Sequence, residues 1–312
     1  MNVVLLFPGQ GSQKPGMAKD LVDALPAARD TFAAVDTALG ESLSTLCFEG
    51  PADALTMTHN AQPALLAHGA AVWATVRDRV GPHVRAAAGH SLGEFTAYHA
   101  AGAYDAARGA RLVRRRGELM HESGVRRPGT MAAILGDVEG GIEAVCAKAS
   151  AEVGCVVPAN YNTPGQVVIS GEVAAVERAM DLAKAAGAKR VIKLNVSGAF
   201  HSPLMAVARE GLADALAAAD LRDPDFPVYA NVTAEPVTSA DDARRLLLEQ
   251  LTSPVAWAQL VERLAADFPD ALYVEMGPGN VLTGLVKKIA PAVQTATCGT
   301  VPEVEHLLAK VS

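Results

Sequence analysis

The fold is decided by the stretch Ala86-Ala87-Ala88-Gly89-His90-Ser91-Leu92-Gly93-Glu94. Small apolar residues run into Gly-x-Ser-x-Gly, and a helical pattern over 94–101 follows directly. A strand, a sharp turn and a helix in this order form a nucleophile elbow, which lifts its serine to the C-terminal edge of a sheet. Gly89 and Gly93 are expected where a side chain would collide with the neighbouring strand or helix. The alternative is a glycine-rich strand–helix turn that merely contains a serine.

Composition narrows the class of protein. The chain has 312 residues, half of them hydrophobic and a fifth charged, so it can bury a large core split into two unequal lobes. A net charge of −7 argues against a nucleic-acid surface. The four cysteines lack C-x-x-C and metal-ligand spacing, which predicts a reducing compartment and no metal. The first strand is too short for a signal sequence and no apolar run reaches membrane-spanning length, so we expect a cytoplasmic protein without a membrane contact.

Apolar runs and helical periodicity predict an α/β fold with an open, α/β-hydrolase-like parallel sheet and right-handed crossovers. The expected strands of this sheet are 3–7, 86–88, 228–232, 272–275 and 295–298. The expected helices are 27–39, 62–79, 105–123, 203–219, 241–251, 254–267, one ending at 289, and a last helix that closes the chain.

A second unit interrupts this pattern. Its expected strands are 131–135, 155–160, 166–170 and 190–196, and its expected helices are 138–151 and 173–186. The order strand–helix–strand–strand–helix–strand predicts a ferredoxin-like subdomain. We therefore predict a large lobe made of 1–127 and 198–312 and an inserted small subdomain of 128–197, with the site in the cleft between them.

A base for Ser91 is expected in the loop that leaves this unit, Ser197-Gly198-Ala199-Phe200-His201-Ser202-Pro203. Of the eight histidines, His201 alone lies in a small-residue loop at the lobe junction, where it can reach Ser91. An unperturbed imidazole titrates near about 6.5, so acylation of the serine should fall at acid pH. The histidine of the elbow turn, His90, is expected to face away from Ser91.

The glycine-rich loop 8–13 follows the first strand and lacks the spacing of a phosphate-binding loop. In elbow enzymes one oxyanion donor is the N–H after the nucleophile, and the other comes from a loop after an earlier strand. These donors are expected to be the N–H groups of Leu92 and Gln10.

Arg116 falls in the middle of the apolar arc of helix 105–123, between Leu112 and Met120. The other arginines of this stretch fall on the opposite side and are expected to be solvated: Arg111, Arg114 and Arg115. A buried guanidinium needs a partner, and no residue one turn away on this face supplies one. One interpretation is a clamp for a substrate carboxylate, with room for its approach at Gly117. The alternatives are a structural pair with a distant Asp or Glu, or a side chain that snorkels outward.

Six segments together closely resemble malonyl-CoA:acyl-carrier-protein transacylases, in the order that the family has them. They are Phe7–Gln13, Gly89–Glu94, Arg116-Gly117, Asn160–Gln166, Gly198–Ser202 and Val274–Gly279. The resemblance covers nearly the whole chain. The family includes the stand-alone enzymes of bacterial fatty-acid synthesis and the acyltransferase domains of polyketide synthases.

This resemblance implies roles for the candidate residues. Ser91 would be the nucleophile, His201 its base, Gln10 and Leu92 the oxyanion hole, and Arg116 the ligand of the malonyl carboxylate. The backbone carbonyl of Gln250 would hold the histidine in place of an Asp. The expected substrate-binding residues are Arg116, Met120, Asn160, Asn162 and Phe200, of which Phe200 matches the malonyl-selecting version of the family.

The implied reaction is ping-pong transfer of a malonyl group from malonyl-CoA to the phosphopantetheine thiol of holo acyl carrier protein. No metal or cofactor is implied, and we expect a monomer. Two other classes compete: a thioesterase or esterase that uses the same elbow, and a non-catalytic docking module of a synthase complex. The hydrolase order Ser…Asp…His needs an acid between 91 and 201, and no Asp there follows a large-lobe strand.

Overall fold

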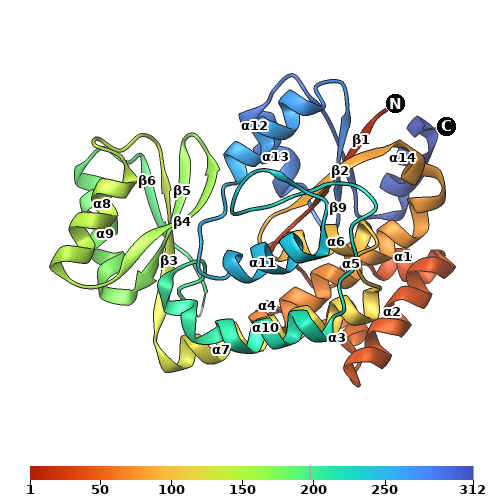
Figure 1. The fold of residues 1–312 in the computed structure, drawn as a ribbon, viewed down its shortest axis with the longest axis horizontal. Coiled ribbons are helices and arrows are strands. Elements are labelled where there is room, and N and C mark those ends of the chain that lie inside the picture. Colours follow the sequence, from red (N-terminus) through yellow and green to blue (C-terminus); the bar gives the residue numbers. More distant parts are fainter. Residues whose placement is uncertain (197, 312) are drawn as a thin grey trace.

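The computed structural model describes residues 1–196 and 198–311 and contains two sheets (Figure 1). The larger sheet has the strand order β10-β9-β1-β2-β7-β8. Neighbouring strands are parallel except for β8, which is antiparallel to β7. The strands are β1 (Val3–Phe7), β2 (Val84–Gly89), β7 (Val228–Tyr229), β8 (Pro236–Val237), β9 (Leu272–Met276) and β10 (Gln294–Cys298). The predicted parallel sheet is therefore confirmed.

Helices cover both faces of the larger sheet. Alternate residues of β1 point to opposite faces, and because all of them are apolar, both faces have to be buried. Leu5 and Phe7 belong to one hydrophobic core, and Val4 and Leu6 to another. The helices are α1 (Lys19–Ala24), α2 (Pro26–Leu39), α3 (Leu43–Glu49), α4 (Ala52–Thr56), α5 (Thr58–Val80), α6 (Leu92–Ala100), α7 (Ala106–Arg126), α10 (Arg209–Ala218), α11 (Ala240–Gln250), α12 (Trp257–Asp267), α13 (Val281–Ile289) and α14 (Val301–Val311).

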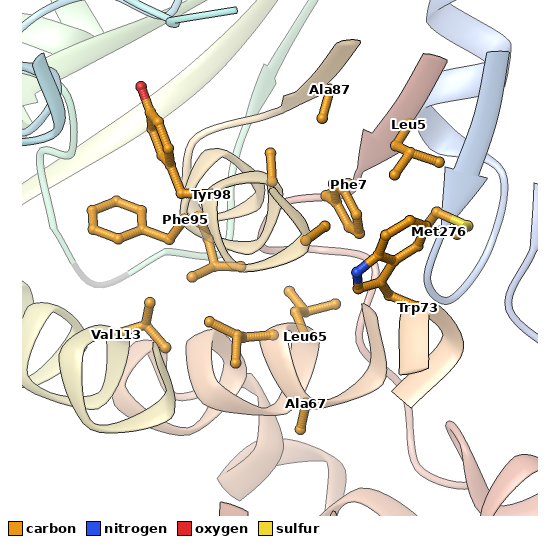
Figure 2. Packing of buried hydrophobic residues seen from close by; sticks show 14 of the residues in the cluster. Leu5, Phe7, Leu65, Ala67, Trp73, Ala87, Phe95, Tyr98, Val113 and Met276 are labelled. Carbon is orange, nitrogen blue, oxygen red and sulfur yellow. The ribbon is translucent and has the colours of Figure 1, made fainter. Parts of the chain in front are cut away.

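The two cores have different helical partners. In the first core, Leu5, Phe7 and Met276 from the sheet lie with Leu65 of α5 and Phe95 of α6 (Figure 2). Helices α12 and α13 supply the helical side of the second core. The elbow helix α6 is thus packed inside the larger core, which fixes the start of that helix at the edge of the sheet.

The smaller sheet has the strand order β4-β5-β3-β6 and is antiparallel throughout. Its strands are β3 (Gly129–Leu135), β4 (Val156–Thr163), β5 (Gln166–Glu172) and β6 (Arg190–Lys193), and its helices are α8 (Ile142–Glu152) and α9 (Val173–Ala185). Both helices pack with the sheet in a separate core (Figure 1). This is the predicted ferredoxin-like arrangement; its predicted last residue, Ser197, lies outside the described residues.

Several predicted element bounds were wrong. Helix α5 begins at Thr58, because the Met57 carbonyl already accepts the N–H groups of Asn60 and Ala61, so Pro63 lies inside the helix. The helix predicted over 203–219 is a 3₁₀ helix, Pro203–Ala208, followed by α10. The strand predicted over 228–232 ends at Tyr229, because Asn231 donates its N–H to Glu94 and not to a neighbouring strand.

Other bounds differ by a few residues. The strand predicted over 190–196 ends at Lys193, and the helix predicted from Pro254 begins at Trp257. A short 3₁₀ helix, Gly81–His83, precedes β2.

Gly93 sits where the elbow packs against β1, as predicted. A Cβ on Gly93 would overlap the backbone carbonyl of Phe7, and one on Gly89 would overlap the backbone of Gly93. We expect Gly93→Ala to lower the free energy of unfolding by at least about 3 kcal/mol, because the added Cβ would meet the backbone of Phe7 and Pro8, which cannot move away as a flexible side chain could. Urea denaturation measures this. Gly284→Ala in α13 is the matched control, since nothing lies within 4 Å of its added Cβ; equal losses in both variants would contradict the packing argument.

Candidate active site

Ser91 lies in the turn between β2 and α6 with φ 52° and ψ −105°, a backbone conformation that is rare for a residue with a side chain. Asn231 holds this turn from the end of β7. Its Oδ1 accepts the Ser91 N–H at 2.7 Å, and its Nδ2 donates to the Gly89 carbonyl at 2.7 Å. The strained serine is therefore fixed by hydrogen bonds on both sides, as expected for a nucleophile elbow.

His201 reaches Ser91 across 110 residues of sequence: its Nε2 lies 2.7 Å from the serine Oγ. Its Nδ1 lies 2.9 Å from the backbone carbonyl of Gln250. A carbonyl oxygen only accepts hydrogen bonds, so Nδ1 carries the proton and Nε2 is free to accept one from Ser91. The geometry suits a serine and its general base.

The acid–base behaviour of His201 differs from the expectation of an unperturbed imidazole. Its side chain is buried, and burial, together with the nearby Arg116 cation, lowers its pKa to about 3. The imidazole is thus neutral throughout the neutral range. Loss of the base at acid pH is expected well below 6.5, which corrects the prediction made from the sequence.

Arg116 points inward, as predicted, and is 1% exposed. It donates to Gln62 Oε1 at 2.7 Å, to Gln250 Oε1 at 2.9 Å and to Ser91 Oγ at 3.3 Å. Its guanidinium carbon lies 5.0 Å from the centre of the Phe95 ring. Burial lowers its pKa to about 10, so it remains a cation at neutral pH.

The outward-pointing alternative for Arg116 is wrong, because the side chain does not reach solvent. Its hydrogen-bond partners in the described residues are neutral, and the acid near it is Glu94, whose charge acts to raise the pKa of Arg116 without a direct hydrogen bond. Two neighbouring predictions were wrong. Gly117 leaves no room for a ligand, because the backbone of Thr58 and His59 lies against it. Arg114 is half-buried and not solvated, since it bonds to Asn60 and Glu41.

A cavity of about 330 Å³ joins Ser91, His201 and Arg116. Its walls include all the other candidate site residues but one: Gln10, Leu92, Met120, Asn160, Asn162 and Phe200. The exception is Gln250, which is fully buried behind Arg116 and His201. In the described residues the N–H groups of Gln10 and Leu92 donate to no acceptor of the chain, so both are available to an oxyanion.

The polar walls of this cavity are themselves held in place. His90 directs its Nε2 to Asn162 Oδ1 at 2.8 Å and not to Ser91, as predicted. Gln10 Oε1 accepts from Thr58 Oγ1. Met120 places its sulfur 3.3 Å from Gln62 Nε2, on the amide that also binds Arg116.

Two polar residues of the site, Gln62 and Asn231, were missed in the sequence, and Glu94 was recognised without its role in the site. Gln62 is the first residue of the helix expected over 62–79, and Asn231 lies within the strand expected over 228–232, so neither stands in a recognisable motif. Glu94 closes the elbow motif and was assigned only to the start of its helix. Nothing local in the sequence could have paired them with residues more than fifty positions away.

In the described residues, no group of three or more His, Cys, Asp or Glu side chains could hold a metal ion. None of the helices in the same part of the chain has the length and apolar character needed to span a bilayer.

The chain is similar to known proteins in sequence and in structure. Residues 4–306 match the family model described as acyl transferase domain. The malonyl CoA-acyl carrier protein transacylase of Bacillus subtilis (strain 168) is 46% identical over 293 residues, which are 94% of this chain and 92% of that protein. The protein of the same name in Escherichia coli (strain K12) is 44% identical over 298 residues, 96% of this chain and 95% of that one.

Solved structures agree with these sequence matches. The acyl-carrier-protein-S-malonyltransferase of Bartonella henselae superimposes with a TM-score of 0.94 and 41% identity, covering 100% of this chain and 99% of that one. A malonyl-transacylase in complex with a type II polyketide synthase acyl carrier protein gives a TM-score of 0.94 and 40% identity, covering 99% of this chain and 100% of that one. The resemblance noted from the six segments is confirmed, and the chain belongs to the acyl transferase domain family.

Proposed function

We propose that this protein transfers a malonyl group from malonyl-CoA to the phosphopantetheine thiol of acyl carrier protein through an acyl-serine intermediate. One observation carries the proposal: the buried Arg116 cation lies 3.3 Å from the Ser91 hydroxyl, inside the same cavity. A closed pocket with a fixed cation beside its nucleophile favours an acyl group that carries its own carboxylate.

The first half-reaction acylates the enzyme. Ser91 Oγ attacks the thioester carbonyl while His201 Nε2 takes the hydroxyl proton, and the Gln250 carbonyl keeps the resulting imidazolium oriented. The N–H groups of Gln10 and Leu92 bind the tetrahedral oxyanion, each contributing about 3 kcal/mol to the transition state. The C–S bond then breaks, and the CoA thiolate takes the proton back from His201.

The second half-reaction repeats these steps with the carrier protein. The phosphopantetheine thiol gives its proton to His201 and attacks the acyl-serine carbonyl, and the serine oxygen leaves with that proton. In these bond-making and bond-breaking steps the transferred proton moves among the two thiols, Ser91 and His201.

Selection of the acyl group is assigned to the walls of the cavity. Arg116 offers parallel N–H donors to the malonyl carboxylate, a geometry that lysine cannot copy. Phe200 and Met120 close the apolar side, and Asn160 and Asn162 shape the polar side. Malonyl-CoA and holo acyl carrier protein are the proposed partners, as the names of the related proteins support.

Three expectations from the sequence stay predictions. They are a monomer, a cytoplasmic location without nucleic-acid binding, and the lobe boundaries 1–127 with 198–312 and 128–197.

Intact mass after incubation with malonyl-CoA tests the proposed function. We expect a stable malonyl adduct, and peptide mapping should place it on Ser91, because this serine alone occupies the elbow and contacts the base. Release of free malonate would favour a hydrolase, and an unchanged mass would favour a docking module. A label on Ser12 or Ser202 would overturn the assignment of the nucleophile.

A further inference from the structure

Glu94 lies in a buried hydrogen-bond network that the proposed mechanism does not use. Its side chain, in the first turn of α6, is 0% exposed. Oε2 accepts from Gln250 Nε2 at 2.7 Å and from the Asn231 N–H at 3.0 Å. Oε1 is buried and has no hydrogen-bond partner among the described residues. A buried carboxyl group that is only half satisfied is costly and calls for an explanation.

A single amide group separates this carboxylate from the Arg116 guanidinium. Gln250 donates through Nε2 to Glu94 and accepts through Oε1 from Arg116 Nη2 at 2.9 Å. Gln250 Nε2 also donates to the Ser91 carbonyl at 3.0 Å. Because a carboxylate only accepts and a guanidinium only donates, the two charges fix the orientation of the amide between them.

The other ionisable groups that face Glu94 are neutral. Burial raises the pKa of the Tyr98 and Tyr104 phenols far above the neutral range, and it lowers the pKa of the His201 imidazole in the same site to about 3. Elements α5, β1, β2 and β7 also pack against α6, and within the described ranges they direct no charged side chain at Glu94. Arg116 is thus the charged group that interacts with this carboxyl.

We propose that Glu94 is the resting counter-charge of Arg116 and takes up a proton when a malonyl carboxylate pairs with that arginine. This inference rests on the proposed function. A bound malonyl group brings a second negative charge into the buried region, and two carboxylates that share one cation repel each other. Protonation of Glu94 removes the repulsion, and its neutral form still accepts the hydrogen bond from Gln250.

The direction of the pH effect follows from linkage. Burial raises the pKa of Glu94 to about 7, with Gln250, Asn231 and Arg116 acting in the opposite sense. At a pH below this value Glu94 is already neutral, and malonyl-CoA binds without competition. As the pH rises through about 7, Glu94 ionises and opposes the malonyl carboxylate, so malonyl binding weakens.

Steady-state kinetics should show this coupling. We expect KM for malonyl-CoA to rise about tenfold between about pH 6 and 8.5, within the usual range of coupling between two sites. KM for acetyl-CoA should stay flat, because its acyl group has no carboxylate. Glu94→Gln should hold KM for malonyl-CoA at the low-pH value throughout. A merely structural role for Glu94 predicts instead an equal loss with both thioesters and an unchanged pH profile.

Proton uptake in the parent enzyme tests the same inference without a variant. The protein is mixed with malonyl-CoA or acetyl-CoA in weakly buffered solution at about pH 7.5 with an indicator dye, and intact mass is taken from the same samples. Both thioesters release the same CoA thiol, so a larger proton uptake per adduct with malonyl-CoA reports the carboxylate alone. We expect that excess in the parent and its loss in Glu94→Gln.

The outcomes separate the two proposals. A malonyl adduct that forms with no excess proton uptake would overturn the role of Glu94 and leave the proposed function standing. Absence of any adduct would overturn both. A malonyl-CoA KM that is independent of pH in the parent would also refute the counter-charge.

Discussion

Replacing His201 by alanine is expected to lower the rate of acylation by malonyl-CoA at pH 7 by about 10³- to 10⁴-fold. The imidazole Nε2 is the group placed 2.7 Å from the Ser91 hydroxyl, and the serine oxygen is a weak nucleophile unless its proton is removed. The measurement is the single-turnover rate of adduct formation. His306→Ala, which changes an exposed histidine on α14, is the matched control and should leave the rate unchanged.

The pH profile adds a second readout for the same residue. Acetyl-CoA is the suitable substrate, since it carries no carboxylate to couple with Glu94. Because burial lowers the pKa of His201 to about 3, the base stays neutral and acylation should be flat down to about pH 5. An acid limb centred near about 6.5 would show that the base is a solvated histidine. Parent-like acylation by His201→Ala would place the base elsewhere.

The parts of the fold that could be predicted are those with a local pattern. The apolar run of β1, the small residues before Gly89 and the proline–glycine turn between β4 and β5 each determine their own element. The inward position of Arg116 also followed from helical periodicity alone. The predicted bounds of an element were wrong where a tertiary contact decides where it ends. At Asn231, for example, the N–H donates to the Glu94 carboxylate and not to a neighbouring strand, so β7 ends before this residue.

The reacting residues of the site could be predicted, but the residues that hold them in position by hydrogen bonds could not. Ser91 and His201 are marked by their loops, whereas the residues that hold them act through contacts across the chain. Gln62 lies 54 residues from the arginine it binds, and Asn231 lies 140 residues from the serine it holds. Burial itself is a property of the folded chain, so the lowered pKa of His201 could not be read from its sequence position.

Replacing Arg116 by alanine is expected to reverse the choice between malonyl and acetyl groups. Arg116 is the cation that would pair with the malonyl carboxylate, and removing one member of a buried pair costs about 3–5 kcal/mol. If this contact persists in the transition state, kcat/KM for malonyl-CoA falls by roughly two to four orders of magnitude. Arg116→Lys should fall between parent and alanine, because an ammonium keeps the charge and loses the parallel donors.

Acetyl-CoA distinguishes this account from a loss of structure. Its acyl group gains nothing from the guanidinium, so Arg116→Ala should hold or raise kcat/KM for acetyl-CoA. The expected quantity is therefore the ratio of the two kcat/KM values, measured for the parent, both variants and Arg111→Ala, which changes an exposed arginine on the same helix. In Arg116→Ala the side-chain amide oxygens of Gln62 and Gln250 lose a hydrogen-bond donor. This loss affects both thioesters alike and cancels in the ratio. An equal fall with both thioesters would assign Arg116 to the support of Gln250 and Ser91, and would remove the basis for malonyl selection.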